Sequence, residues 1–176
     1  MFPKGNCKYG YIDKSGQIAV EPQFDDAHQF SEGLARIEVN NKSGYIDKNG
    51  SVIIKPQFDH ARDFKEELAA VKIDDKWGFV DKTGAIVIEP QFDWVDEFSE
   101  GLAVVQISDE YGYIDKTGKM VIEPRFYYAR NFSENLAAVE ILRSIYKSKW
   151  AYIDREGHVV IDINSDNAYS FNEGLA

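Results

Sequence analysis

The sequence predicts an all-β protein built as a tandem array of about five 34-residue repeats. Three observations predict it. A short motif with a central glycine returns at a constant interval, and proline and phenylalanine landmarks return at the same interval. The apolar runs between them are short, rich in β-branched and aromatic residues, and bounded by Asp, Lys and Gly, which favours strands over helices. Residues 1–176 are therefore treated as one array, with units at approximately 8–41, 42–75, 76–109, 110–148 and 149–176.

The repeat is visible in three independent sets of landmarks. An interval of 34 residues separates the members of each set: Gly10, Gly44, Gly78 and Gly112; Pro22, Pro56, Pro90 and Pro124; Phe24, Phe58, Phe92 and Phe126. The last unit carries Ala151 at the glycine position, 39 residues after Gly112, so five extra residues precede it. Chance does not produce several landmarks in one register, and a fixed period of this length is typical of repeat architectures.

Each unit is expected to be a three-stranded antiparallel meander. In the third copy the strands are residues 68–73, 77–81 and 85–89. The turn from Asp81 to Gly84 joins the second strand to the third, because the Asp side chain can accept turn amides and Gly supplies a positive φ. The third strand is apolar on both faces, which predicts cover on both sides, and Pro90 ends it.

Two further features of the unit carry structural predictions. Gly78 in mid-strand predicts a close neighbour, which we expect to be an aromatic side chain from the adjoining segment. Phe92, Val95 and Phe98 recur at steps of three, which predicts one or two turns of 3₁₀-like helix between the third strand and the next unit. Each buried phenylalanine would contribute about 2 kcal/mol. Gly101 would end this helix, although other units place Glu or Asn there.

One meander cannot bury both of its faces, so neighbouring units must stack. The expected arrangement is an open, solenoid-like or superhelical array. The alternative is a small closed propeller of five blades. We favour the open array, because propeller blades have four strands and longer repeats.

Composition narrows the classes of partner. The net charge of −10 disfavours nucleic acid and anionic membrane surfaces. Cys7 is the only cysteine, so no intrachain disulfide can form. No apolar run is long enough for a membrane span, and no signal peptide is visible, so a cytoplasmic location is the default expectation.

No motif for catalysis or metal binding stands out. The histidines His28, His60 and His158 occupy three different repeat positions, and the Asp-x-x-Gly turn lacks the further oxygen ligands of a calcium loop. Paired carboxylates of the glycosidase type have no specific support. We therefore expect no enzyme, no cofactor and no metal.

Recognition is expected where the repeats differ or are interrupted. One variable position is filled by Asp26, His60, Trp94 and Tyr128, and the insertion at 142–149 forms a small basic island. The strand aromatics at positions 77, 111 and 150 are interpreted mainly as core. The candidate binding residues are Trp94, Tyr128, His60, Arg143, Tyr146 and Lys147.

The segments Lys76–Gly84 and Phe98–Ala103 resemble the bacterial WG (KWG) repeat family. The similarity extends over essentially the whole chain after about residue 7, although Trp occupies the family's named position only at Trp77 and Trp150. The resemblance implies a β-rich bacterial repeat protein and no catalytic residues. The expected function is a non-catalytic scaffold or binding module for protein or peptide partners. The alternative is a module that binds carbohydrate or cell-wall glycan through strand aromatics.

Overall fold

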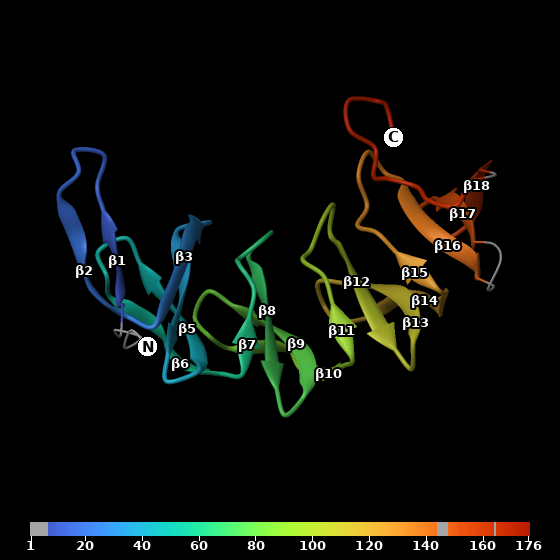
Figure 1. Ribbon diagram of the computed structural model, residues 1–176. Coiled ribbons are helices and arrows are strands. Elements are labelled where there is room, and N and C mark those ends of the chain that lie inside the picture. Colours follow the sequence, from blue (N-terminus) through green and yellow to red (C-terminus); the bar gives the residue numbers. More distant parts are fainter. Residues whose placement is uncertain (1–6, 144–147, 164) are drawn as a thin grey trace, which may run out of the picture.

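The computed structural model describes residues 7–143, 148–163 and 165–176, and these residues form strands and turns (Figure 1). None of the described segments is a helix that could cross a membrane. The strands are β1 (Tyr9–Ile12), β2 (Ile18–Phe24), β3 (Asp26–Ser31), β4 (Leu34–Val39), β5 (Lys42–Asp47), β6 (Val52–Phe58), β7 (His60–Ala61), β8 (Leu68–Ile73), β9 (Lys76–Asp81), β10 (Ile86–Phe92), β11 (Trp94–Val95), β12 (Leu102–Ile107), β13 (Glu110–Asp115), β14 (Met120–Phe126), β15 (Tyr128–Ala129), β16 (Ala137–Arg143), β17 (Ser148–Ile153) and β18 (Val159–Ile163).

The strands form five antiparallel sheets, one for each repeat. The first sheet is the hairpin β1–β2, and the other four have four strands each: β3 to β6, β7 to β10, β11 to β14 and β15 to β18. The three-stranded unit predicted from the sequence is therefore wrong for these four sheets. The additional strand is the first of each sheet, and it lies in the segment that we expected to be helical.

The spacing of three in this segment comes from a bulged edge strand. In the second four-stranded sheet, the N–H groups of residues 59, 62 and 65 donate to the carbonyls of residues 72, 70 and 68 at 3.0, 2.9 and 2.9 Å. The donors advance by three residues while the acceptors advance by two, so each step leaves one residue unpaired. This pairing buries Phe58, Ala61 and Phe64 together, and the predicted 3₁₀-like helix is wrong.

The predicted Asp-x-x-Gly hairpin is confirmed. The Gly84 N–H donates to the Asp81 carbonyl at 3.0 Å, and Gly84 has a φ of 86°. Asp81 Oδ1 accepts the N–H groups of Thr83 at 2.8 Å and Ala85 at 3.0 Å. The turn Asp thus organises the backbone amides of its own turn, as the sequence indicated.

The close neighbour of Gly78 is backbone and not an aromatic ring. A Cβ atom at Gly78 would lie 2.4 Å from the Ile88 carbonyl oxygen and 2.7 Å from the Pro90 nitrogen. Ile88 pairs with Phe79 and Phe92 pairs with Trp77, so β10 advances four residues while β9 advances two. The two extra residues form a bulge around Pro90 that lies over the glycine, which corrects the predicted neighbour.

The turn that leads into the second strand of each four-stranded sheet has positive φ at both central positions. Glu66 and Glu67 have φ values of 51° and 76°, and Glu32 and Gly33 repeat the pattern in the preceding unit. The carboxylate of Glu32 accepts the N–H of Glu66 at 2.7 Å and that of Glu67 at 2.9 Å. Each turn glutamate therefore holds the next turn, and these contacts connect neighbouring sheets.

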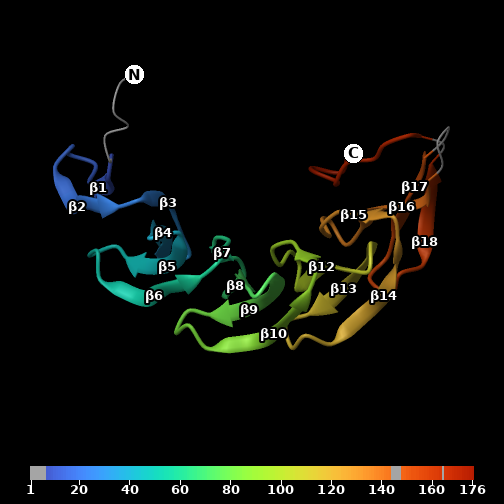
Figure 2. The same ribbon diagram turned by 60° about the horizontal axis from the view of Figure 1, so that its bottom comes forward.

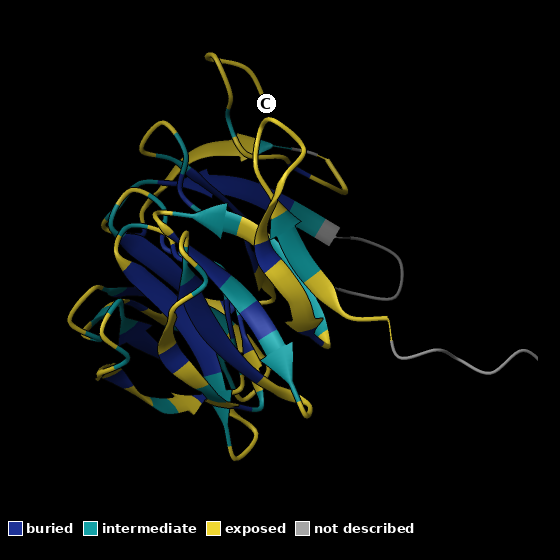
Figure 3. Cartoon of the chain, turned by 90° about the vertical axis from the view of Figure 1, so that its left-hand side faces the viewer, coloured by how far each residue is buried: buried dark blue, intermediate teal, exposed yellow. Residues whose placement is uncertain are grey.

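The sheets stack face to face along an arc. In Figure 2 the hairpin β1–β2 and the sheet β15–β18 lie at opposite ends of the arc, β3, β7 and β15 lie on its concave side, and β6, β10 and β14 lie on its convex side. The core between the sheets β7–β10 and β11–β14 contains Phe79, Ile88, Ala103 and Ile114. Buried residues are concentrated in the central strands, and the turns are exposed (Figure 3).

In the last strands β6, β10 and β14, the third residue is buried and the two residues before it are more exposed. Ile88 is 3% exposed, but Ile86 and Val87 are each 43% exposed. The prediction of cover on both sides is wrong, because β10 lies on the convex side of the arc (Figure 2) and, of these three residues, only Ile88 packs into the core.

Candidate functional site

The variable residues share one place in successive sheets. Asp26, His60, Trp94 and Tyr128 begin the short strands β3, β7, β11 and β15, which pair with the second strand of each sheet. We call these four residues the concave row, because their strands lie along the concave side of the arc (Figure 2). Three of the predicted binding residues, His60, Trp94 and Tyr128, belong to it.

Two members of the concave row contact rings from the third strand of their own or the preceding sheet. Trp94 and Tyr111 have ring centres 6.0 Å apart, Tyr111 and Tyr128 are 5.3 Å apart, and Tyr128 and Trp150 are 5.9 Å apart. Aromatic pairs in this range attract each other in tilted and edge-to-face arrangements. The contacts continue from the sheet β11–β14 into the sheet β15–β18.

Two arginines extend this line of rings. The Arg62 guanidinium lies 5.4 Å from the centre of the Trp77 ring and 5.3 Å from that of Trp94. Arg130 lies 5.9 Å from the centre of the Tyr128 ring and 5.5 Å from that of Trp150. These are cation–π distances. We call this group the aromatic–arginine ladder. Its members are Trp77, Trp94, Tyr111, Tyr128, Trp150, Arg62 and Arg130.

Carboxylates and carbonyls fix the arginines of the ladder. Arg62 Nη1 lies 3.8 Å from Asp96 Oδ1, and Arg130 Nε donates to the Ala168 carbonyl at 2.7 Å. Beside them, burial raises the pKa of the Glu97 carboxyl; Lys65 opposes this rise and Asp96 adds to it. Charges of both signs therefore lie beside the ladder.

Most of the ladder is buried or half-buried, and its margin is exposed to solvent. Trp150 is buried, while Trp77, Trp94 and Tyr111 are half-buried. His60 is exposed and Tyr128 is 39% exposed. The interpretation of the strand aromatics as core is confirmed for Trp150. The accessible part of the ladder is the edge formed by the concave row.

The predicted basic island lies mostly outside the described residues. Arg143 ends β16 and its backbone pairs with Ser148, which places the insertion in the hairpin between β16 and β17. The side chain of Arg143 and the residues Tyr146 and Lys147 are not among those described. Recognition by this loop stays a prediction.

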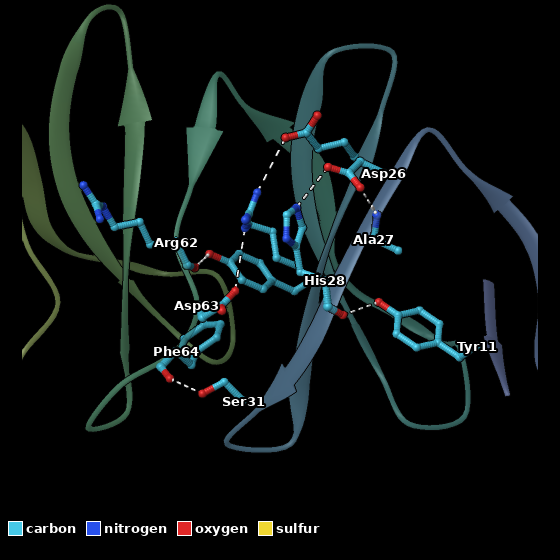
Figure 4. Close-up of polar contacts among 11 residues, drawn as sticks. Tyr11, Asp26, Ala27, His28, Ser31, Arg62, Asp63 and Phe64 are labelled. Carbon is cyan, nitrogen blue, oxygen red and sulfur yellow. Dashed lines mark hydrogen bonds and ion pairs between the residues drawn. The ribbon is translucent and has the colours of Figure 1, made fainter. Parts of the chain in front are cut away.

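A polar cluster between β3 and β4 was missed by sequence reasoning. His28 Nε2 lies 3.2 Å from Asp26 Oδ2, and Arg36 Nη1 lies 3.6 Å from Glu38 Oε1 (Figure 4). Arg36 Nε also faces Asp63 Oδ1 at 3.7 Å, across to the next sheet. The available signal was Asp26 and His28 on one face of a strand, with Glu38 on the next strand.

The fold defines a class: tandem-repeat β proteins whose sheets stack along an arc and present a variable row on the concave side. Five stretches of the chain match the family described as "WG containing repeat", at residues 9–42, 44–77, 77–110, 111–141 and 150–176. These stretches cover most of the chain. The protein therefore belongs to the WG repeat family.

Several solved structures resemble the chain at low sequence identity. A crystal structure titled as the eukaryotic initiation factor matches with a TM-score of 0.61 and 12% identity, over 94% of this chain and 53% of that chain. The present chain thus spans about half the length of that protein, and the likeness concerns the fold alone. A protein of unknown function from Bacteroides caccae matches with a TM-score of 0.39 and 16% identity, over 92% of this chain and 70% of that chain.

A plant lectin from Cicer arietinum matches with a TM-score of 0.32 and 15% identity, over 83% of this chain and 90% of that chain. This score is too low to support an argument about binding. No curated protein sequence matches the chain.

Proposed function

We propose that the protein is a non-catalytic WG-repeat scaffold that binds protein or peptide partners along the concave row. One observation carries the proposal: the four variable residues of the concave row share one repeat position on the concave side (Figure 2), whereas the constant residues hold the sheets together. The turn Asp binds its own turn amides, the turn Glu binds the next turn, and the mid-strand glycine admits the bulge. Repeat arrays commonly bind partners on such a concave surface.

The chemistry of the row favours a polypeptide over a sugar. Sugar binding by stacking needs a free ring face, but Arg62 lies over the ring of Trp94, and Tyr111 contacts that ring as well. What remains accessible is the imidazole of His60, the margin of Tyr128 and the charges of Arg62 and Asp96. A peptide with polar, charged and apolar groups in series matches this mixture. A glycan-binding module remains the alternative outcome of the test.

Selection from a random peptide library against the wild-type protein tests the proposal. Peptides that bind should lose affinity at least about tenfold, or 1.4 kcal/mol, in the double variant His60→Ser and Tyr128→Ser. The matched control is Val87→Thr, which changes an exposed side chain on the convex side and should leave the affinity unchanged. Peptides that bind the double variant equally well would place recognition elsewhere. Quenching of tryptophan fluorescence by soluble glycans would favour the carbohydrate alternative.

We also propose that the units form an open array in solution, with a closed five-bladed propeller as the alternative. The arc of Figure 2 supports the open form, since the first and last sheets lie at its opposite ends. The four-stranded sheets remove one objection to the propeller, because four strands are usual in its blades. Small-angle scattering discriminates the two: an elongated particle supports the open array, and a near-spherical one refutes it.

A further inference from the structure

The polar cluster of Figure 4 occupies a place that other repeats fill with rings and bulky side chains. Ser43 stands at the repeat position of Trp77, Tyr111 and Trp150. Asp26, His28 and Glu38 stand at positions that the later units fill differently. Those units have His60, Arg62 and Lys72; Trp94, Asp96 and Gln106; Tyr128, Arg130 and Glu140. The sheet β3–β6 alone combines two carboxylates with an imidazole at these positions.

The three side chains converge at distances that suit metal ligands. One ligand atom from each of Asp26, His28 and Glu38 lies within 4.8 Å of the others, and His28 Nε2 is 3.2 Å from Asp26 Oδ2. Bonds of about 2.0–2.2 Å to zinc place neighbouring tetrahedral ligands roughly 3.4 Å apart. The His28–Asp26 separation already has this size, and Glu38 needs only a small side-chain adjustment.

A buried hydroxyl beside the cluster gives an independent indication. Ser43 pairs with Glu38 and Glu38 pairs with Asp26, so the three side chains project from the same face of the sheet. Ser43 is 1% exposed, and its Oγ has no hydrogen-bond partner. A buried polar atom without a partner is unfavourable, so a bound water or ion beside it would stabilise this arrangement. His28 Nε2 is also buried and makes no hydrogen bond.

The cluster has an excess of negative charge that a divalent cation can balance. Arg36 is 3.6 Å from Glu38 and 3.7 Å from Asp63, and both separations are too long for hydrogen bonds. The Arg36 guanidinium therefore lies beside two carboxylates, Glu38 and Asp63, and Asp26 adds a third, which leaves two carboxylate charges in excess. A divalent ion would balance them.

We propose that Asp26, His28 and Glu38 bind a divalent transition-metal ion, with Zn²⁺ as its representative. One imidazole with two carboxylates suits zinc and its neighbours better than calcium or magnesium, which bind through oxygen ligands. The side chains of Asp26 and Glu38 are only partly buried, so the ion can enter and keep water at its remaining positions. Ser43 would act as a positioning residue that donates a hydrogen bond to Glu38.

Calorimetric titration with ZnCl₂ tests the site in the full chain carrying Cys7→Ser, which removes the exposed thiol. We expect one saturable site per chain and at least about a tenfold loss of affinity in His28→Gln. The matched control is His158→Gln, since His158 also lies beside a carboxylate, Asp154, at 3.3 Å. This control should bind zinc like the parent. Zinc should also raise the melting temperature of the parent and of His158→Gln, but not that of His28→Gln.

Two further measurements keep the proposal falsifiable if His28→Gln folds poorly. Ser43→Ala removes a hydroxyl that has no partner, so it should fold normally and bind zinc several-fold more weakly. Co²⁺ bound to the parent should give a visible absorption band that is lost on competition with zinc. The absence of saturable binding to the parent, or equal affinity in folded His28→Gln, would overturn the proposal.

Discussion

The substitution Gly78→Ala tests the bulge of β10 that lies over this glycine. The new Cβ atom would lie 2.4 Å from the Ile88 carbonyl oxygen and 2.7 Å from the Pro90 nitrogen, distances that real Cβ atoms essentially never show. Both obstacles are backbone atoms, which cannot rotate away like the end of a side chain. The backbone of β10 must therefore move by about 1 Å to restore ordinary contact, or the pairing of β9 with β10 must change.

The size of the effect follows from two opposing contributions. Forcing an extra methyl group into a packed site costs about 1–3 kcal/mol, and we expect the upper end because backbone must shift. Replacing a strand glycine by alanine returns about 0.5–1 kcal/mol through reduced chain entropy. The net loss of unfolding free energy is about 2 kcal/mol, which lowers the melting temperature by about 4–8 °C for a chain of this length.

Urea unfolding followed by circular dichroism, with melting curves in parallel, measures the loss. The matched control is Ala151→Gly, at the same repeat position in the last sheet. There Ala151 pairs with Asp162 and the neighbouring pairs are in regular register, so no bulge lies over it. The control should lose about 1–2 kcal/mol, from chain entropy and from the loss of one buried methyl group. If Gly78→Ala unfolds at the parent's urea midpoint, or loses less than the control, the close backbone approach is not what selects glycine.

Three further predictions concern the turns and the contacts between sheets. Gly84→Val should destabilise by at least about 1 kcal/mol, because φ is 86°; an unchanged melting midpoint would contradict the turn assignment. Tyr45→Phe removes the buried hydroxyl that donates to the Arg62 carbonyl at 2.6 Å and should cost about 1–2 kcal/mol in urea unfolding, whereas a neutral result would show that water replaces it. The hydrogen bond from Thr83 lowers the pKa of Asp81 in the folded state, so this stabilisation is present above the unfolded pKa of about 3.9 and is lost as the pH falls below it. The melting temperature should fall on acidification towards pH 3, and it should fall less steeply in Thr83→Ala. If it falls equally steeply in the parent and in Thr83→Ala, the hydrogen bond from Thr83 to Asp81 does not contribute to this pH dependence.

The features predicted correctly from the sequence depend on residues that are close in the chain. The Asp81 to Gly84 turn is specified by its own four residues. The repeat interval is read directly from residues that recur in the sequence, and it needs no knowledge of the fold. Placing His60, Trp94 and Tyr128 at one repeat position required only the alignment of units. Because each short strand pairs in the same register, equivalent positions in the sequence become equivalent positions in space.

The errors arose where a spacing has two physical meanings. Phe92, Val95 and Phe98 at steps of three fit a tight helix and also fit an edge strand with a bulge at each step. Only the partner strand decides between them, and its carbonyls come from later in the chain, at residues 106, 104 and 102. The neighbour of Gly78 was misjudged for a related reason, since the bulge at Pro90 depends on the register between two strands.

The cross-strand register also explains why one place in the repeat can support two kinds of chemistry. Each residue of the concave row also begins a row of paired residues across its own sheet. One such cross-strand row runs from Tyr128 through Glu140 to Trp150, and another runs from Asp26 through Glu38 to Ser43. The backbone pairing is the same, so the difference lies in the side chains. A ring in the third strand contacts the ring of the concave row, as Trp150 contacts Tyr128. A serine leaves this position polar, and the row then has carboxylates and an imidazole turned towards one another. The constant residues of the repeat hold both rows in position, which lets the variable residues change their chemistry without changing the fold.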